Sequence, residues 1–237
     1  MTAKVPLPPG MPNRMKSLPT DDVGRPVPFF AGYVDGVPDF RTMTSAALVD
    51  CVRKSLCWVC GQPLLKRYGK PVGTFVAGPM CLVNGTSAEP PSHADCAEWC
   101  ARACPFLLNP NKVRREANLP DGYIEPAGIM LDRNPGVTAL IESCRWQAFD
   151  PGNRGVLLHF DRIQRVDWLS RGDVATTDEV LTSIDTGLPD LLALAREQEA
   201  DGAVTALRSL LRYALLWVDD WRPAVDAGGF PTIAELV

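Results

Sequence analysis

The stretch LCWVCGQPL (Leu56–Leu64) contains two cysteines that are separated by two residues and followed by a glycine. A Cys-x-x-Cys-Gly turn can supply two thiolates to a tetrahedral metal site, because its backbone N–H groups donate hydrogen bonds to the sulfurs. Gly61 permits the tight turn that brings those N–H groups into place. The stretch therefore predicts one half of a zinc site, and two more ligands have to come from elsewhere.

The other half is predicted in the segment EPPSHADCAEWCARA (89–103). We expect a helix from about His93 to Ala103, because two prolines precede it and Ser92 is a suitable N-cap residue. His93 and Cys96 are then three residues apart on the first turn and point the same way. Imidazole and thiolate are both good zinc ligands. The predicted closed, structural zinc site comprises Cys57, Cys60, His93 and Cys96.

Alternatives for the cysteines remain open at the level of the sequence. Cys81 and Cys104 are the substitute ligands if one of the four is not used. An iron–sulfur cluster recruiting Cys81, Cys100 or Cys104 is a less favoured possibility, as is a set of buried thiols without metal. Cys51 and Cys144 are expected in the core.

The order of elements around these ligands predicts a treble-clef-like zinc module. It consists of the Cys-x-x-Cys-Gly turn at residues 57–61 (the knuckle), a β-hairpin and a helix. The hairpin is expected from PLLKRY (63–68) and GTFVAGPMCLV (73–83), joined by a loose turn. Another hairpin is predicted upstream, around Asp35-Gly36, because this dipeptide tolerates the positive φ angles of a tight turn. A helix over residues 45–56 leads into the knuckle.

The second half of the chain predicts a small β meander followed by helices. Three strands are expected at 136–143, 145–149 and 155–161, with turns at Cys144-Arg145 and 151–154. Helical patterns begin at Thr176, which forms a predicted capping box with Glu179, and are expected to break at 187–189 and 201–202.

Together these elements predict an α+β protein in four parts. They are an extended Pro-rich arm (1–28), a β-hairpin plus zinc-binding module (29–108), a linker (109–128), and a β meander plus helical acidic tail (129–237).

Composition favours a cytoplasmic protein. No segment has the roughly eighteen uninterrupted apolar residues of a membrane span, and the N-terminus lacks the apolar stretch of a signal peptide. Thiols stay reduced inside cells, so the eight cysteines are better interpreted as metal ligands and core residues than as disulfides.

Several enzyme classes do not fit. A nuclease of the His-Asn-His type needs several histidines, but the chain has two, and His159 lies in the apolar stretch LLHFD. A zinc deaminase needs His-x-Glu before Pro-Cys-x-x-Cys, whereas here the histidine follows the cysteines. The sequence contains no phosphate-binding glycine loop, nucleophile elbow or dinucleotide fingerprint.

Charge is distributed unevenly and suggests two interaction surfaces. Residues 51–115 contain nine Lys/Arg and three Asp/Glu, a net charge of +6, whereas residues 116–237 contain ten Arg and twenty acids, a net charge of −10. The basic region could bind nucleic acid, with an aromatic ring for stacking. The candidate residues are Lys66, Arg67, Lys70, Trp99, Arg102, Lys112, Arg114 and Arg115. The acidic tail fits a protein partner equally well.

Several segments resemble an uncharacterised family of cysteine-rich bacterial and bacteriophage proteins that has no assigned activity. They are 24–41 (GRPVPFFAGYVDGVPDFR), 56–61 (LCWVCG), 78–84 (GPMCLVN), 88–99 (AEPPSHADCAEW), 103–107 (ACPFL) and 175–195 (ATTDEVLTSIDTGLPDLLALA). The resemblance implies a phage or prophage setting, and hence the host cytoplasm, but no mechanism. In the family pattern Cys81 and Cys104 match, whereas a small residue replaces Cys100.

The leading hypothesis is a non-enzymatic, zinc-stabilised adaptor or regulator that acts through protein or nucleic-acid contacts. One alternative is a hydrolase or nuclease acting on nucleic acid through a carboxylate site that the sequence does not identify. Another is a protein that binds a host factor, such as a polymerase or defence protein, through the acidic tail.

Overall fold

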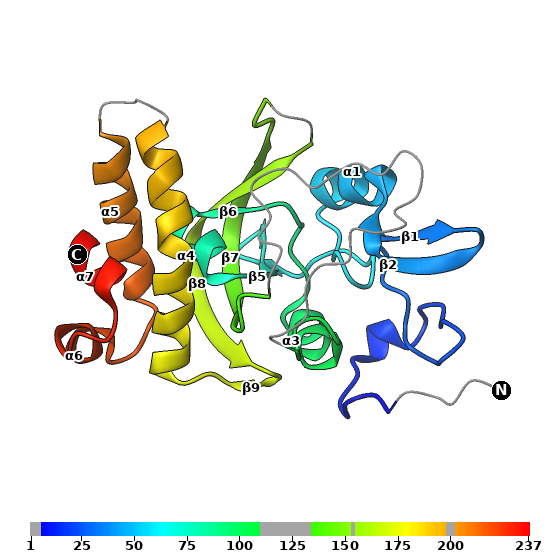
Figure 1. Cartoon of the computed structure of the whole chain (residues 1–237). Coiled ribbons are helices and arrows are strands. Elements are labelled where there is room, and N and C mark those ends of the chain that lie inside the picture. The colour runs from blue at the N-terminus through cyan, green and yellow to red at the C-terminus, as the bar shows by residue number, and fades with distance from the viewer. Residues whose placement is uncertain (1–5, 110–133, 153–154, 198–201) are drawn as a thin grey trace.

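The computed structural model describes residues 6–109, 134–152, 155–197 and 202–237. Within these residues the chain forms seven α-helices, one short 3₁₀ helix and three antiparallel sheets. The largest sheet is curled and lies in the middle of the molecule, with helices on both sides (Figure 1). This arrangement confirms the predicted α+β class.

The N-terminal elements follow the sequence prediction closely. β1 (Ala31–Val34) and β2 (Val37–Met43) form the expected hairpin, and the turn residues Asp35 and Gly36 have φ angles of 50° and 78°. α1 (Ser45–Lys54) begins after Thr44, whose side chain accepts a hydrogen bond from the N–H of Ala47. The arm before them contains the 3₁₀ helix η1 (Asn13–Met15).

The second predicted hairpin is wrong in its pairing. β3 (Lys66–Arg67) pairs with the short β4 (Lys70–Pro71) across a tight turn at Tyr68-Gly69, while β5 (Gly73–Ala77) pairs with a strand far along the chain. The predicted strand 73–83 also ends early, and α2 (Pro79–Asn84) follows it. Proline is favoured at the first position of a helix, and Gly85 ends α2 in the left-handed conformation.

The central sheet has the strand order β5-β7-β8-β6, and β9 (Asp173–Val174) pairs with the end of β8. β7 (Thr138–Phe149) and β8 (Leu157–Ser170) are long partners, and β6 (Thr86–Ser87) is a short edge strand.

The turn predicted at Cys144-Arg145 is wrong, because both of these residues lie inside β7. Instead, the register of the β7–β8 pairing shifts between Glu142 and Ser143. At this point the Ser143 hydroxyl donates to the carbonyl oxygens of Arg145 and Asp161.

The C-terminal quarter is a helical layer formed by α4 (Thr177–Glu197), α5 (Ala203–Leu215), α6 (Trp221–Asp226) and α7 (Pro231–Leu236). The break predicted at 187–189 is wrong, because α4 continues through Pro189. Its buried residues Leu181, Ile184, Leu188 and Leu192 form one helical stripe across the proline. Burying this stripe on the sheet outweighs the hydrogen bond that Pro189 cannot donate.

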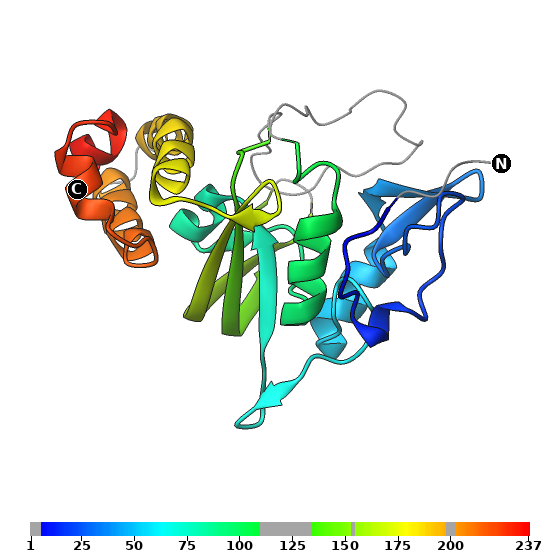
Figure 2. The same cartoon turned by 90° about the horizontal axis from the view of Figure 1, so that it is seen from below.

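The helices cover the two faces of the sheet unequally. α2, α4 and α5 lie on one face, and α3 (Ala94–Ala103) lies on the other (Figure 2). Ala97 and Ala101 of α3 pack against Leu140 and Leu169 of the sheet, and these small residues allow a close approach. α3 is the helix predicted from the sequence, so the sheet supports the helix that carries two of the predicted metal ligands.

The sheet combines strands from both sides of the predicted linker, since β5 precedes it and β7 follows it. The linker itself (109–128) lies outside the described residues apart from Asn109. The four-part division therefore stays a prediction. No helix in the described part of the chain is long and apolar enough to cross a membrane.

The capping box at the start of α4 is confirmed. The Thr176 N–H donates to the Glu179 carboxylate at 2.9 Å, and the Glu179 N–H donates to the Thr176 hydroxyl at 3.3 Å. The hydrogen bond from the Thr176 backbone, followed by that from Ser170, lowers the pKa of Glu179. A lowered folded-state pKa means that the stabilisation exists at neutral pH and is lost as the pH falls through that value.

We expect Glu179→Ala to lower the free energy of unfolding by about 0.5–1 kcal/mol at neutral pH, because half of the box is lost at an exposed site. The difference from wild type should shrink in acid. Urea unfolding at several pH values measures both effects. Glu197→Ala, at the opposite end of α4, is the matched control and should change stability little. An equal effect of the two substitutions at neutral pH would contradict the assignment.

Candidate metal centre

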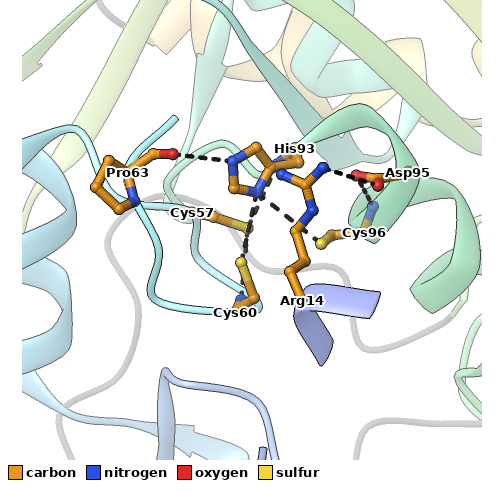
Figure 3. A network of polar contacts seen from close by, with 7 residues as sticks. All are labelled: Arg14, Cys57, Cys60, Pro63, His93, Asp95 and Cys96. Carbon is orange, nitrogen blue, oxygen red and sulfur yellow. Dashed lines mark hydrogen bonds and ion pairs between the residues drawn. The ribbon is translucent and has the colours of Figure 1, made fainter. Parts of the chain in front are cut away.

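Four side chains form a buried cluster between the turn at Cys57–Gly61 and the start of α3. The ligand atoms of Cys57, Cys60, His93 and Cys96 all lie within 4.8 Å of one another, and all four residues are buried. The two cysteines of the knuckle face the histidine and cysteine at the start of α3 (Figure 3). Three sulfurs and one imidazole at this separation could hold a metal ion such as zinc.

The knuckle is shaped by hydrogen bonds to Cys57. Its sulfur accepts from the N–H of Cys60 at 3.4 Å and from the N–H of His93 at 3.3 Å. Its carbonyl accepts from Gly61, which has a φ of 70°. A Cβ at position 61 would also lie 2.7 Å from the ring of Phe29. Glycine is therefore required here both for the backbone conformation and for the close approach of Phe29.

The histidine is oriented by a backbone carbonyl. Its Nε2 lies 3.0 Å from the carbonyl oxygen of Pro63, and Nδ1 lies 3.4 Å from the Cys60 sulfur and 4.0 Å from the Cys96 sulfur (Figure 3). A carbonyl oxygen only accepts, so Nε2 carries a proton and donates it to Pro63. Nδ1 is then the nitrogen that points at the sulfurs, which is the arrangement that fixes a histidine ligand in metal sites.

Helix α3 starts at Ala94, one residue later than predicted, so His93 lies at the N-cap position. The N-cap is His93 and not Ser92, because the N–H and carbonyl of Ser92 are both paired with Thr74 of β5. The pairing fixes the backbone immediately before the ligand. Cys96 lies on the first turn, where the N-terminal end of the helix favours negative charge.

The charges of the cluster are strongly coupled. Hydrogen bonds from the Cys60 and Cys96 thiols hold the pKa of Cys57 far below its usual range, and donation to Cys57 and Cys60 raises the pKa of Cys96. Burial lowers the pKa of His93, but its hydrogen bonds to Cys57 and Cys60 outweigh burial and raise that pKa to about 10. A divalent ion would displace these protons, since ligands bind metal in their deprotonated form.

The other cysteines are not part of this group. Burial raises the pKa of Cys51 and of Cys100 to about 12, and that of Cys81 to about 11. Such thiols stay protonated and pack as small apolar groups. The predicted substitute ligands Cys81, on α2, and Cys104, at the end of α3, are not brought into the four-ligand cluster. Cys144 is half-buried on β7 and was expected in the core.

The N-terminal arm covers the cluster, which the sequence analysis did not anticipate. Met15 is buried against the ligand cysteines, and Leu7, Met11 and Leu18 pack around them. Arg14 forms an ion pair with Asp95 at 3.2 Å, and the indole N–H of Trp99 donates to the Pro8 carbonyl (Figure 3 shows the ion pair). The sequence does contain a signal for this contact, because apolar residues recur at regular spacing among the prolines of the arm.

The predicted nucleic-acid residues that the structure describes belong to separate elements. Lys66, Arg67 and Lys70 lie on the β3–β4 hairpin, whereas Arg102 pairs with Glu98 and donates to the Gly172 carbonyl. Trp99 is buried, which leaves its ring no face for a base. Lys112, Arg114 and Arg115 lie outside the described residues.

Comparisons of the chain with protein-family models, with curated proteins and with solved structures give no significant match. The family resemblance therefore stays a prediction, and the four-residue cluster is the feature that bears on function.

Proposed function

We propose that Cys57, Cys60, His93 and Cys96 bind one structural zinc ion in a treble-clef-like module, and that the protein is a non-enzymatic, zinc-stabilised adaptor or regulator. The knuckle is followed by the β3–β4 hairpin and, after β5, α2 and β6, by α3, so the proposed module contains the expected knuckle, hairpin and helix with additional elements between the last two. The ion would join the knuckle to α3. It would thereby also link the arm, which packs on the ligand cysteines, to the central sheet, which packs against α3.

The observation that supports a structural role is the closure of the donor set. Four protein ligands complete the tetrahedral coordination that zinc prefers, whereas catalytic zinc sites keep one position for water or substrate. All four residues are buried, and the arm lies over them with Met15. A substrate would have to reach ligands that are buried and partly covered by the arm.

Within the part of the chain that the structure describes, the potential metal ligands outside this cluster do not gather in a second one. No other group of three or more of them lies close together in the described residues, which disfavours the alternative of a carboxylate-based nuclease with a bound metal.

A cytoplasmic location is part of this proposal. All eight cysteines are free thiols, and three of them would have to remain reduced to act as thiolate ligands. Reducing compartments maintain thiols in that state.

Metal analysis combined with cobalt substitution tests the proposal. We expect purified protein to contain about one zinc ion per chain, because the described residues contain one four-ligand group. Replacing zinc by Co²⁺ should give the visible spectrum of a tetrahedral thiolate site. Added azide should leave this spectrum unchanged, because a closed site has no position for a fifth ligand.

A spectrum that shifts with azide would show an open coordination position and would overturn the structural role. Iron and acid-labile sulfide in the purified protein would show that the cysteines hold an iron–sulfur cluster and not zinc. Cys144→Ser is the matched control, because this cysteine lies outside the group, and its zinc content should equal that of wild type.

A further inference from the structure

The β3–β4 hairpin projects from the rest of the molecule beyond one end of the central sheet (Figure 2). Lys66 faces Pro71 and Arg67 faces Lys70 across the two-residue turn of Tyr68 and Gly69. Tyr68, at the tip, is 99% exposed, and Leu65, just before the hairpin, is 65% exposed. The hairpin therefore presents an uncovered aromatic ring among cations.

Several features of this hairpin oppose its own stability. Tyr68 has a φ of 52°, a conformation that bulky residues rarely adopt and that asparagine or glycine takes more readily in such turns. Arg67 and Lys70 place like charges directly opposite each other. Strained backbone conformations and unfavourable charge pairs concentrate at functional sites. The hairpin is therefore a candidate for binding.

The three cations have different environments. Arg67 lies 3.3 Å from a carboxylate oxygen of Glu142 and 2.6 Å from the amide oxygen of Gln164. These contacts attach the hairpin to β7 and β8, and they fix its direction. No ion pair within the described part of the chain involves Lys66 or Lys70, and both are exposed. Two lysines near the tip are therefore available to an anionic partner.

We propose that the β3–β4 hairpin binds single-stranded nucleic acid, with the Tyr68 ring stacked on an unpaired base and Lys66 and Lys70 on neighbouring phosphates. The inference rests on the proposed function, because it names the partner of the zinc-stabilised module. Stacking on an aromatic ring combined with phosphate contacts is the general mode of sequence-tolerant binding to single strands.

The exposed ring favours nucleic acid over an acidic peptide. A peptide rich in Asp and Glu would use the lysines but gain little from an aromatic side chain, whereas a base has a π-face that covers the ring. A duplex offers fewer unpaired bases, because its bases are stacked on one another. Single strands are therefore the preferred partner, and Tyr68 takes the role that the sequence analysis gave to the buried Trp99.

Fluorescence anisotropy with a short, labelled, random-sequence DNA oligonucleotide at low salt tests this site on the full chain. Wild type should bind the single strand more tightly than the same sequence as a duplex. Tyr68→Ala should raise Kd by about tenfold, the size expected for one lost stacking contact. Tyr68→Phe keeps the ring and should bind like wild type.

Tyr68→Asn separates loss of the ring from loss of the hairpin, because asparagine tolerates the φ of this position. It should weaken binding as much as Tyr68→Ala. The double variant Lys66→Gln/Lys70→Gln should make the slope of log affinity against log salt less steep by about 1.4, since each phosphate contact in a single strand contributes about 0.7.

The inference is overturned if zinc-loaded wild type does not bind the oligonucleotide, if Tyr68→Ala binds unchanged, or if Tyr68→Asn retains wild-type affinity. It is also overturned if polyglutamate displaces the strand at equal charge concentration, which would indicate an acidic protein partner. Zinc content is measured on each sample. Absent zinc contradicts the proposed function, whereas full zinc occupancy without binding contradicts the hairpin inference alone.

Discussion

Replacing Cys57 by serine is expected to abolish zinc binding and to unfold the module formed by the arm, the knuckle and α3. A hydroxyl is a poor substitute for a thiolate, and the sulfur of Cys57 also accepts the N–H groups of Cys60 and His93. Structural zinc contributes apparent binding free energies of about 10–16 kcal/mol, which exceeds or matches the net stability of most domains, about 5–15 kcal/mol.

The measurement is thermal unfolding followed by circular dichroism and by tryptophan fluorescence, together with zinc content. Trp58 and Trp99 are buried beside the cluster and should report its loss. A strong chelator added to wild type should produce the same unfolded signals. Cys144→Ser makes the same chemical change outside the cluster and should retain both zinc and Tm. Retention of one zinc and of wild-type Tm by Cys57→Ser would refute a structural site at these residues.

The second large effect is expected from Phe75→Ala, with a loss of about 3–5 kcal/mol in the free energy of unfolding. Phe75 is fully buried on β5, where its ring packs edge-on against Trp146 and tilted against Phe160. The two ring centroids lie 6.0 Å and 4.8 Å away, within the range of favourable aromatic pairs. Truncation leaves a cavity between β5 and the rest of the sheet.

This substitution also tests whether the two halves of the chain unfold together. β5 belongs to the segment that contains the metal ligands, but it pairs with β7 from the C-terminal half. We therefore expect zinc release and loss of secondary structure to occur in one denaturant transition in wild type, and at a lower concentration in Phe75→Ala. Phe149→Ala, at the exposed end of β7, is the matched control and should change stability little. Two separate transitions would support independent domains.

The candidate site was predictable because its information is local. Cys57 and Cys60 belong to one tight turn and His93 and Cys96 to one helical turn, so their spacing alone orients each pair. The burial of all four and the orientation of His93 by Pro63 needed the folded chain. Ser92 looked like an N-cap because its side chain suits that position, but pairing with the distant Thr74 moved the cap to His93.

The sequence by itself determined the α+β class, the first hairpin with its Asp35-Gly36 turn, the capping box of α4 and the four-residue cluster. The hairpin, the capping box and each of the two ligand pairs depend on residues close in sequence, whereas the meeting of the two pairs depends on the fold. Only the tertiary structure decided that β5 pairs with β7, that α4 continues through Pro189, and that the arm covers the metal ligands. These outcomes follow from burying apolar surface between distant segments, and local pattern does not encode which distant surface is available.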